Sequence, residues 1–230
     1  MDAIYLFDGA GALHGPVILT EIPGLGAQMP SNAIVLPKVL AAPKVGHVWT
    51  LTQGQVTLLP DFRGTVYSTV DGAQQQHTAL GDLPVGFASV PRPSAAYLWQ
   101  DGAWVKSATY LHARKTAEIN RGCELSITGG FWSSALGSAY QYSSELDDQL
   151  NLTGVILRGE ESPYACRDEQ GQKAFLLHSA LQLRQVGDDF TLFKLQLLQK
   201  ANRLKQQLDQ ALSDGDVAAI EALSGEDPQA

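Results

Sequence analysis

The sequence predicts an α+β protein: a β-rich N-terminal region of short hairpins, then a mainly α-helical C-terminal domain that contains a small β-hairpin. Two observations support this prediction. Short apolar or β-branched runs separated by glycine-containing turns recur as far as Lys106, and from Ser107 onward the apolar residues recur at intervals of three and four. We therefore expect domains over residues 1–106 and 107–224, followed by a polar tail over residues 225–230.

The N-terminal region contains dipeptides that favour the positive φ angles of tight hairpin turns. Three hairpins are expected around Gln53-Gly54, Asp71-Gly72 and Asp101-Gly102. A further hairpin is expected at Asp8-Gly9, with residues 16–19 as its returning strand. Residues 22–43 carry four prolines, which predict an edge strand or an irregular crossing, since proline cannot donate to a β-ladder.

The C-terminal region is expected to alternate helices with short extended segments. A helix over residues 108–126 should end at Gly129-Gly130, and an aromatic hairpin should follow at residues 131–134 and 139–142. The next helix is expected from a cap at Ser144 to Gly159. The remaining segments are, in order, a loop at 163–171, a strand or helical lead-in at 173–177, a helix capped by Ser179, a long amphipathic helix over 190–211 and a short helix over 217–223.

Composition narrows the classes of function. The chain has 230 residues and a formal net charge of −8, which disfavours binding to a phosphate backbone, so no nucleic-acid partner is expected. Neither a signal peptide nor an apolar run of about 20 residues is visible, which predicts no membrane association and a cytoplasmic protein. The two cysteines, Cys123 and Cys166, are expected to be reduced core residues.

No catalytic or cofactor motif is complete. The glycine pairs near the N-terminus do not form a phosphate-binding loop, and the histidines lack zinc-ligand spacing, so neither a cofactor nor a metal is expected. Glu145, Asp147 and Asp148 are adjacent at a helix start, where carboxylates favour the helix dipole. The protein is therefore predicted not to be an enzyme; a hydrolase using Ser133 and His178 is the enzymatic alternative.

Aromatic residues are the strongest candidates for a functional surface. Two short hairpins are crowded with them, and the alternatives are packing in a core or contact with a partner protein. The candidate partner-binding residues are Trp99, Trp104, Phe131, Trp132, Tyr140 and Tyr142. The long helix over 190–211 has the same two interpretations, as core of the helical domain or as a helix for a partner or self-association.

Residues 119–186 resemble the DUF4376 domain of bacteriophage and prophage tail-associated proteins. The match is a series of short motifs that cover roughly the C-terminal half of the chain together with the helices after them. The matching positions are Gly130, Phe131, residues 133–137, Tyr142, residues 148–152, Gly154, Tyr164, Cys166, Gly171 and His178.

The N-terminal half is similar to the tail fibre assembly proteins. The similarity is carried by shorter, turn-rich motifs at residues 61–67, Asp71-Gly72, residues 80–86, residues 91–93, and Trp99, Gly102 and Trp104.

Together these resemblances imply a dedicated, non-enzymatic chaperone for a phage-type tail fibre. Such a protein binds the C-terminal, receptor-binding part of the trimeric fibre and promotes its folding and assembly, without a cofactor. The implied location is the cytoplasm of the bacterial host, with retention on the assembled fibre in some cases. The alternative is a structural tail-tip component that stays bound to the fibre and contacts the host surface.

Overall fold

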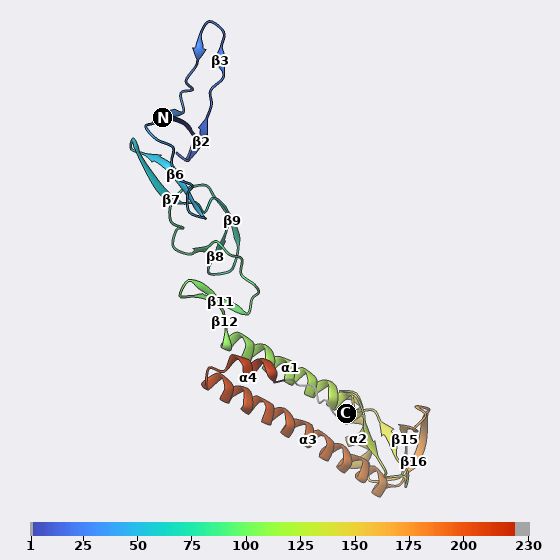
Figure 1. Ribbon diagram of the computed structural model, residues 1–230. Coiled ribbons are helices and arrows are strands. Elements are labelled where there is room, and N and C mark those ends of the chain that lie inside the picture. The colour runs from blue at the N-terminus through green and yellow to red at the C-terminus, as the bar shows by residue number, and fades with distance from the viewer. Residues whose placement is uncertain (1, 224–230) are drawn as a thin grey trace. The chain divides into compact units, whose positions relative to one another are not determined.

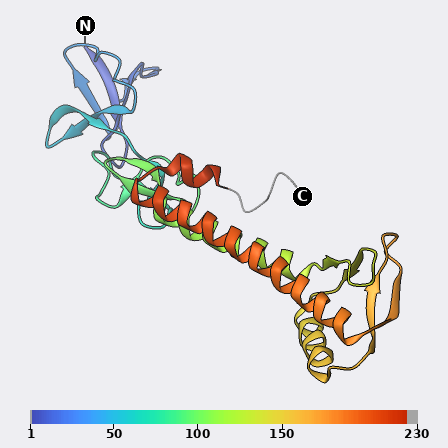
Figure 2. The same ribbon diagram turned by 90° about the horizontal axis from the view of Figure 1, so that it is seen from below.

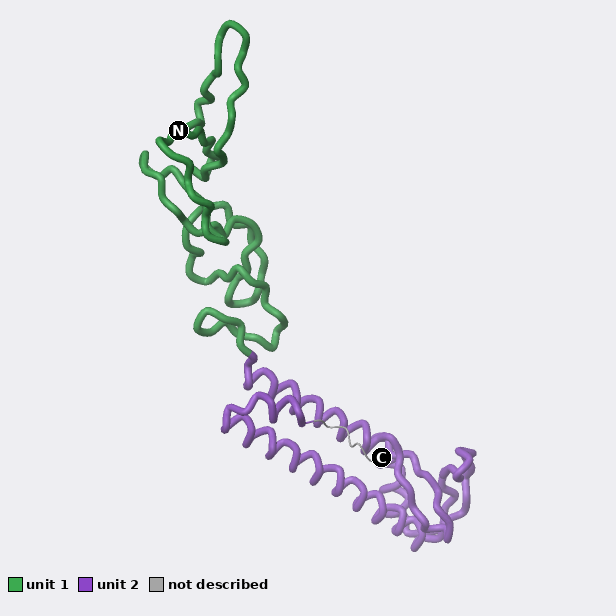
Figure 3. The backbone as a smooth tube through the Cα atoms, viewed as in Figure 1, with its two compact units in different colours: residues 1–105 green, residues 106–230 purple. Residues whose placement is uncertain are grey.

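The computed structural model describes residues 2–223, and the chain divides into two compact units, residues 1–105 and 106–230 (Figure 3). In the described chain the first unit contains antiparallel strands and no helix, and the second contains four helices and a small sheet. The predicted fold class, a β-rich region of short hairpins followed by a mainly helical part, is confirmed. The predicted tail over residues 225–230 lies outside the described residues.

The N-terminal unit begins with a three-stranded antiparallel sheet. Its strands, in the spatial order β2-β1-β5, are β1 (Ala3–Phe7), β2 (Leu13–Val17) and β5 (Ala33–Leu36). In the sequence between β2 and β5, a two-stranded hairpin forms from β3 (Glu21–Ile22) and β4 (Gly26–Ala27). The proline-rich segment supplies β5 as an edge strand, as expected. The returning strand starts at Leu13, earlier than predicted, and the carboxylate of Asp8 accepts the N–H groups of Ala10 and Ala12 in the short loop between the strands.

The other strands of this unit form the three predicted hairpins. They are β6 (His47–Thr52) with β7 (Gln55–Pro60), β8 (Gly64–Ser68) with β9 (Gln74–His77), and β11 (Tyr97–Gln100) with β12 (Ala103–Lys106); β10 (Phe87–Ala88) adds to β8. Gln53 and Asp101 have φ angles of 51° and 50°, and the φ angle of the glycine after each is also positive. Both turns therefore have the two positive φ angles that a two-residue hairpin requires. The loop that contains Asp71-Gly72, between β8 and β9, is longer than these two-residue turns.

An ion-pair cluster joins two loops of the N-terminal unit. The Arg63 guanidinium donates from Nε and Nη2 to the two carboxylate oxygens of Asp61 at 2.9 and 2.7 Å, and from Nη1 to Asp8 at 2.7 Å. Asp8 lies directly after β1, and Asp61 and Arg63 lie between β7 and β8. The bidentate pair with Asp61 orients Arg63 within its own loop, since a guanidinium offers parallel donors that match a carboxylate. The bond to Asp8 then ties that loop to the one after β1.

The C-terminal unit contains a helical stalk. It consists of α1 (Ala108–Thr128), α3 (Ala180–Ser213) and α4 (Val217–Ala222), which lie side by side (Figures 1 and 2). Leu111, Ile119 and Ile127 are buried on one face of α1, at intervals of eight residues. His112 contacts Asp209 of α3 at 2.7 Å across the helix pair. An apolar seam with polar contacts at its rim thus holds the stalk together.

One end of the stalk carries a four-stranded antiparallel sheet and a helix (Figure 1). The strands lie in the order β13 (Phe131–Ser133), β14 (Tyr140–Tyr142), β15 (Ser162–Arg167) and β16 (Lys173–His178), and the helix is α2 (Leu146–Arg158). The expected loop at 163–171 is therefore wrong over β15. β14 pairs with β15 at Arg167, which lies at the opposite end of β15 from Pro163. The missing N–H of Pro163 therefore removes no hydrogen bond between these two strands.

Two helix boundaries also differ from the prediction. The N-cap of α2 is Glu145, because the Ser144 hydroxyl is buried and donates to the Ile127 carbonyl while it accepts the Gly130 N–H. The helix capped by Ser179 continues through residues 190–211 as the single 34-residue α3. Gly187 lies within it, and a Cβ there would meet Cδ1 of Ile156 at 2.6 Å. The glycine therefore allows α2 to approach α3 closely.

Candidate functional site

The inner face of the four-stranded sheet forms the core of the C-terminal unit. Phe131 and Tyr142 are 2% and 0% exposed and stack with their ring centroids 5.6 Å apart. Phe131 also packs against Phe190 and Phe193 of α3. The expectation that Phe131 and Tyr142 contact a partner is corrected, because strand pairing points both side chains into the core. Tyr140 is half-buried and packs against the same core.

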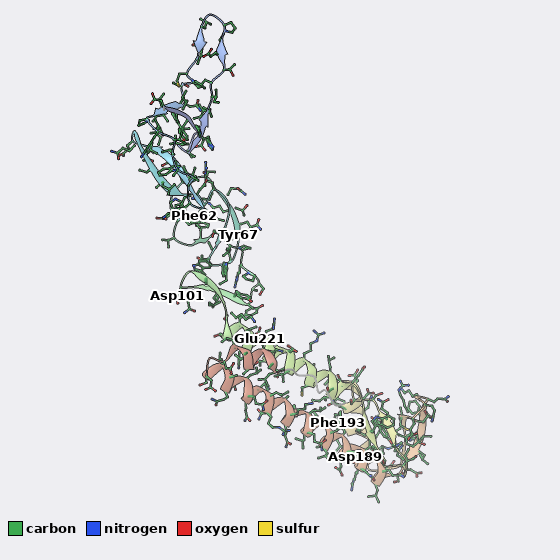
Figure 4. The ribbon with its side chains drawn as sticks, viewed as in Figure 1. Phe62, Tyr67, Asp101, Asp189, Phe193 and Glu221 are labelled. Atoms are coloured by element: carbon green, nitrogen blue, oxygen red, sulfur yellow. The ribbon has the colours of Figure 1, made fainter. Side chains whose placement is uncertain are left out.

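Ser133 and His178 have hydrogen-bond partners other than each other. The Ser133 hydroxyl donates to Oδ2 of Asp189 at 2.5 Å, and Figure 4 places Asp189 and Phe193 on the part of α3 beside the sheet. Nε2 of His178 lies 2.9 Å from the Tyr142 hydroxyl, and Nδ1 lies 2.8 Å from the Leu176 carbonyl. Both side chains are buried. This geometry is that of packed, hydrogen-bonded core residues, not of a nucleophile beside its base.

Trp99 and Trp104 are neighbours across the β11–β12 hairpin, as predicted. Their ring centroids lie 5.1 Å apart in a T-shaped arrangement. Nε1 of Trp104 donates to the Val90 carbonyl at 3.0 Å, and the guanidinium carbon of Arg92 lies 5.8 Å from the Trp104 ring centroid. These contacts give both tryptophans, which are half-buried, a structural role in tying the hairpin to the segment before it.

The outer face of the same sheet is exposed and carries the sixth predicted residue, Trp132. Residues directly paired across antiparallel strands point to one face. Trp132 pairs with Gln141, Gln141 with Arg167, and Arg167 with Lys173, so one row crosses all four strands. Trp132 is 52% exposed.

Along β16 this face continues with two large apolar side chains. Phe175 and Leu177 follow Lys173 at alternate positions, and they are 71% and 60% exposed. Their partners on β15 are Ala165 and Pro163. We call the surface the outer sheet face; it comprises Trp132, Gln141, Pro163, Ala165, Arg167, Lys173, Phe175 and Leu177.

Sequence reasoning missed most of the outer sheet face. Trp132 was identified by its aromatic character, whereas Arg167, Lys173, Phe175 and Leu177 were not. The available signal was the short apolar run over residues 174–177, which is consistent with a strand but does not show which of its side chains face solvent. That signal becomes informative only once residues 162–167 are recognised as the neighbouring strand.

Other exposed apolar side chains lie on the helices of this unit. Leu146, Leu150 and Leu157 of α2 are 71%, 72% and 80% exposed. A groove of about 650 Å³ runs between α2 and α3, with Leu152 and Leu195 among its lining residues. These surfaces lie apart from the outer sheet face, since Leu152 packs in the core on the sheet's inner side.

Residues 2–223 contain no group of three or more His, Cys, Asp or Glu side chains arranged to hold a metal ion. Within the same residues no helix is both long enough and apolar enough to span a bilayer. The two cysteines are free thiols, and burial raises the pKa of the Cys166 thiol, which favours its protonated form.

Comparison with known families gives one match. Residues 110–223 match the model of a family described as Domain of unknown function (DUF4376). The matched segment extends from the first turn of α1 to the residue after α4, and so includes the stalk, the sheet and α2. The DUF4376 domain expected from the sequence motifs is therefore present. No curated protein and no solved structure matches the chain.

Proposed function

We propose that this protein is a non-enzymatic chaperone for a phage-type tail fibre. It binds the C-terminal, receptor-binding part of the fibre chain and promotes its folding and trimeric assembly. The proposal is supported by the resemblance of the N-terminal half to tail fibre assembly proteins and by the DUF4376 match over residues 110–223. The supporting structural observation is the outer sheet face, where Trp132, Phe175 and Leu177 stand exposed on one side of a well-packed domain.

The physical requirement of fibre assembly suits such a surface. A trimeric fibre forms by β-pairing between distant residues and between chains, so its monomers expose unpaired strand edges and apolar side chains before they associate. A protein with exposed apolar side chains on a sheet can cover those surfaces until the trimer closes. Of the six residues predicted for partner contact, Trp132 is exposed on the outer sheet face, and Trp99, Trp104 and Tyr140 are partly exposed.

Co-expression with a candidate phage-type tail fibre tests the proposal. The fibre should accumulate as soluble trimer when the protein is present and as monomer or aggregate when it is absent. Equal yields of soluble trimer in both cases would refute a chaperone role. The same preparation distinguishes the structural alternative, since a tail-tip component would remain bound to purified particles at a fixed ratio.

A further inference from the structure

We propose that the open edge of β16, with the outer sheet face beside it, accepts an extended polypeptide segment that carries apolar side chains at alternate positions and a carboxylate placed to meet Arg167 and Lys173. The segment adds as a fifth antiparallel strand. In the proposed function this segment belongs to the unassembled fibre chain, and to that extent the inference rests on that proposal. Its test with peptides is independent of the fibre.

The outer edge of β16 is regular and open to a further strand. β16 pairs with β15 over six consecutive residues without a shift of register, and in residues 2–223 no strand pairs with its other side. Proteins protect such edges with prolines, bulges or several charges. β16 has the sequence KAFLLH, in which Lys173 is the single Lys, Arg, Asp or Glu. A regular, mostly apolar edge of this length favours strand addition.

Two large apolar side chains lie beside this edge. The Phe175 and Leu177 side chains point to the outer face and stay largely in solvent, because Ala165 and Pro163 opposite them are small. A strand added to β16 would place its own side chains about 5 Å from these two residues. Apolar residues two positions apart in the partner would cover both.

Two cationic side chains lie next to each other on the outer sheet face. Arg167 and Lys173 are paired directly across β15 and β16, where like charges are destabilising. Arg167 donates to the Gly171 carbonyl at 3.3 Å, and among residues 2–223 neither cation forms an ion pair with a carboxylate. A partner carboxylate beside this pair would relieve the repulsion. Asp168 and Glu169 lie in the turn between the two strands, and the Asp168 carboxylate accepts the N–H groups of Gln170 and Gln172 instead of pairing with either cation. Arg167 and Lys173 can therefore each accept a carboxylate from an acidic ligand.

The antiparallel pairing of the sheet sets the orientation of the added segment, and the carboxylate it must carry excludes a second copy of this chain as the preferred occupant. The pairings within this sheet are antiparallel, and an antiparallel partner passes Leu177 first, then Phe175, then Lys173. The partner therefore has two apolar residues followed by an acidic one, each separated by one residue. A second β16 contains no Asp or Glu, so it lacks the required carboxylate.

The test uses the full chain and two fluorescein-labelled peptides with blocked termini, TVTVTET and TVTVTKT. Fluorescence anisotropy should show tighter binding of the acidic peptide, by about three- to tenfold, as expected for an exposed carboxylate beside two cations. Hydrogen exchange should show new protection of the β16 amides in the complex. Equal affinities, absence of binding, or protection confined to the α2–α3 groove would each overturn the proposal.

Variants identify the residues responsible. Lys173→Glu should remove or reverse the preference for the acidic peptide. Phe175→Ser and Leu177→Ser should each lower the affinity for both peptides at least threefold. Leu150→Ser is the matched control, because it removes an equally exposed leucine from α2 and should leave binding unchanged. Circular dichroism checks that each variant is folded. Unchanged binding by Phe175→Ser and Leu177→Ser would contradict the assigned surface.

Failure of this inference is distinguishable from failure of the proposed function. If the fibre still needs the protein for soluble trimer but the Phe175→Ser and Lys173→Glu variants support assembly as well as the wild type, the chaperone role stands and the β16 surface is wrong. If the peptides bind as described but the fibre assembles equally well alone, the surface stands and the chaperone role is wrong.

Discussion

The Tyr142 hydroxyl donates a hydrogen bond to Nε2 of His178, over 2.9 Å, in the buried centre of the C-terminal unit. The direction follows from the other ring nitrogen. Nδ1 of His178 lies 2.8 Å from the Leu176 carbonyl, which can only accept, so Nδ1 carries the proton and Nε2 is the acceptor. Burial raises the pKa of Tyr142 above its usual value, so the hydroxyl keeps the proton that it donates.

Tyr142→Phe should destabilise the C-terminal unit. The substitution preserves the ring and its stacking on Phe131, but it leaves Nε2 of His178 buried without a donor, which costs about 1–3 kcal/mol in unfolding free energy. Urea unfolding followed by circular dichroism measures the change. Tyr110→Phe is the control, because Tyr110 is 42% exposed. If both variants lose the same stability, the buried hydrogen bond has no special role.

Arg63→Met should lower the stability of the N-terminal unit at neutral pH by about 1–2 kcal/mol, since Arg63 forms charged hydrogen bonds with two half-buried aspartates. Partial burial raises the pKa of Asp8, but hydrogen bonds from Arg63, Ala12, Ala10 and His14 outweigh this and hold the pKa below its usual value. The hydrogen bond from Arg63 is the main cause of the lowered pKa of Asp61.

The stability that Arg63 provides should therefore depend on pH. A carboxylate with a lowered pKa in the folded state stabilises the fold above its unfolded pKa, about 4, and this contribution is lost as the pH falls through the folded pKa. The difference between wild type and Arg63→Met should shrink when unfolding is measured at successively lower pH from 5 to 2. Arg121→Met, an exposed change in the other unit, should show a small difference that stays constant. If the difference in unfolding free energy between wild type and Arg63→Met is as large at pH 2 as at pH 5, the ion-pair explanation is contradicted.

Gly187→Ala should show opposite effects in two backgrounds. In the wild type the new Cβ meets Cδ1 of Ile156 at 2.6 Å, so α2 or the Ile156 side chain must shift. Valine at position 156 lacks this Cδ1 atom. In the Ile156→Val background, Gly187→Ala should therefore raise the unfolding free energy by about 1 kcal/mol, because alanine has a higher helix propensity than glycine. Urea unfolding of the four proteins in a double-mutant cycle measures the coupling. Additive effects would mean that Gly187 does not set the α2–α3 approach.

Trp104→Ala and Trp132→Ala should separate the structural tryptophan from the surface one. Trp104 donates to the Val90 carbonyl and packs on Trp99, so its loss should cost about 1–3 kcal/mol of unfolding free energy. Trp132 is 52% exposed on the outer sheet face, and its loss should cost under about 0.5 kcal/mol. Thermal unfolding of both variants checks this order, and the reverse order would disprove the assignment.

Local chemistry explains which elements could be predicted from the sequence. The turn at Asp101-Gly102 and the start of α3 at Ser179 depend on residues adjacent in the chain, so their positions were expected correctly. β15 was missed because Pro163 and the polar turn after Arg167 are typical of a loop, while the strand is formed by pairing with β16. Such pairing is a tertiary effect that local propensity does not encode.

The candidate site was predicted only in part for the same reason. Phe131 and Trp132 are adjacent aromatic residues, and the sequence does not say which points inward. The pairing of Phe131 with Tyr142 settles the matter, since a shift of one residue would exchange the two faces of the strand. Aromatic content thus indicated the segment that carries Trp132, but not which of its aromatic side chains are exposed.

The central claim is that this protein assists fibre assembly by binding alone, without catalysis. The most direct measurement is refolding of the denatured C-terminal part of the fibre, with and without an equimolar amount of the purified protein, in buffer that contains no nucleotide. Native mass spectrometry gives the yield of fibre trimer. The account predicts a yield several times higher with the protein than with an equal amount of an unrelated protein. The same trimer yield in both cases would contradict it.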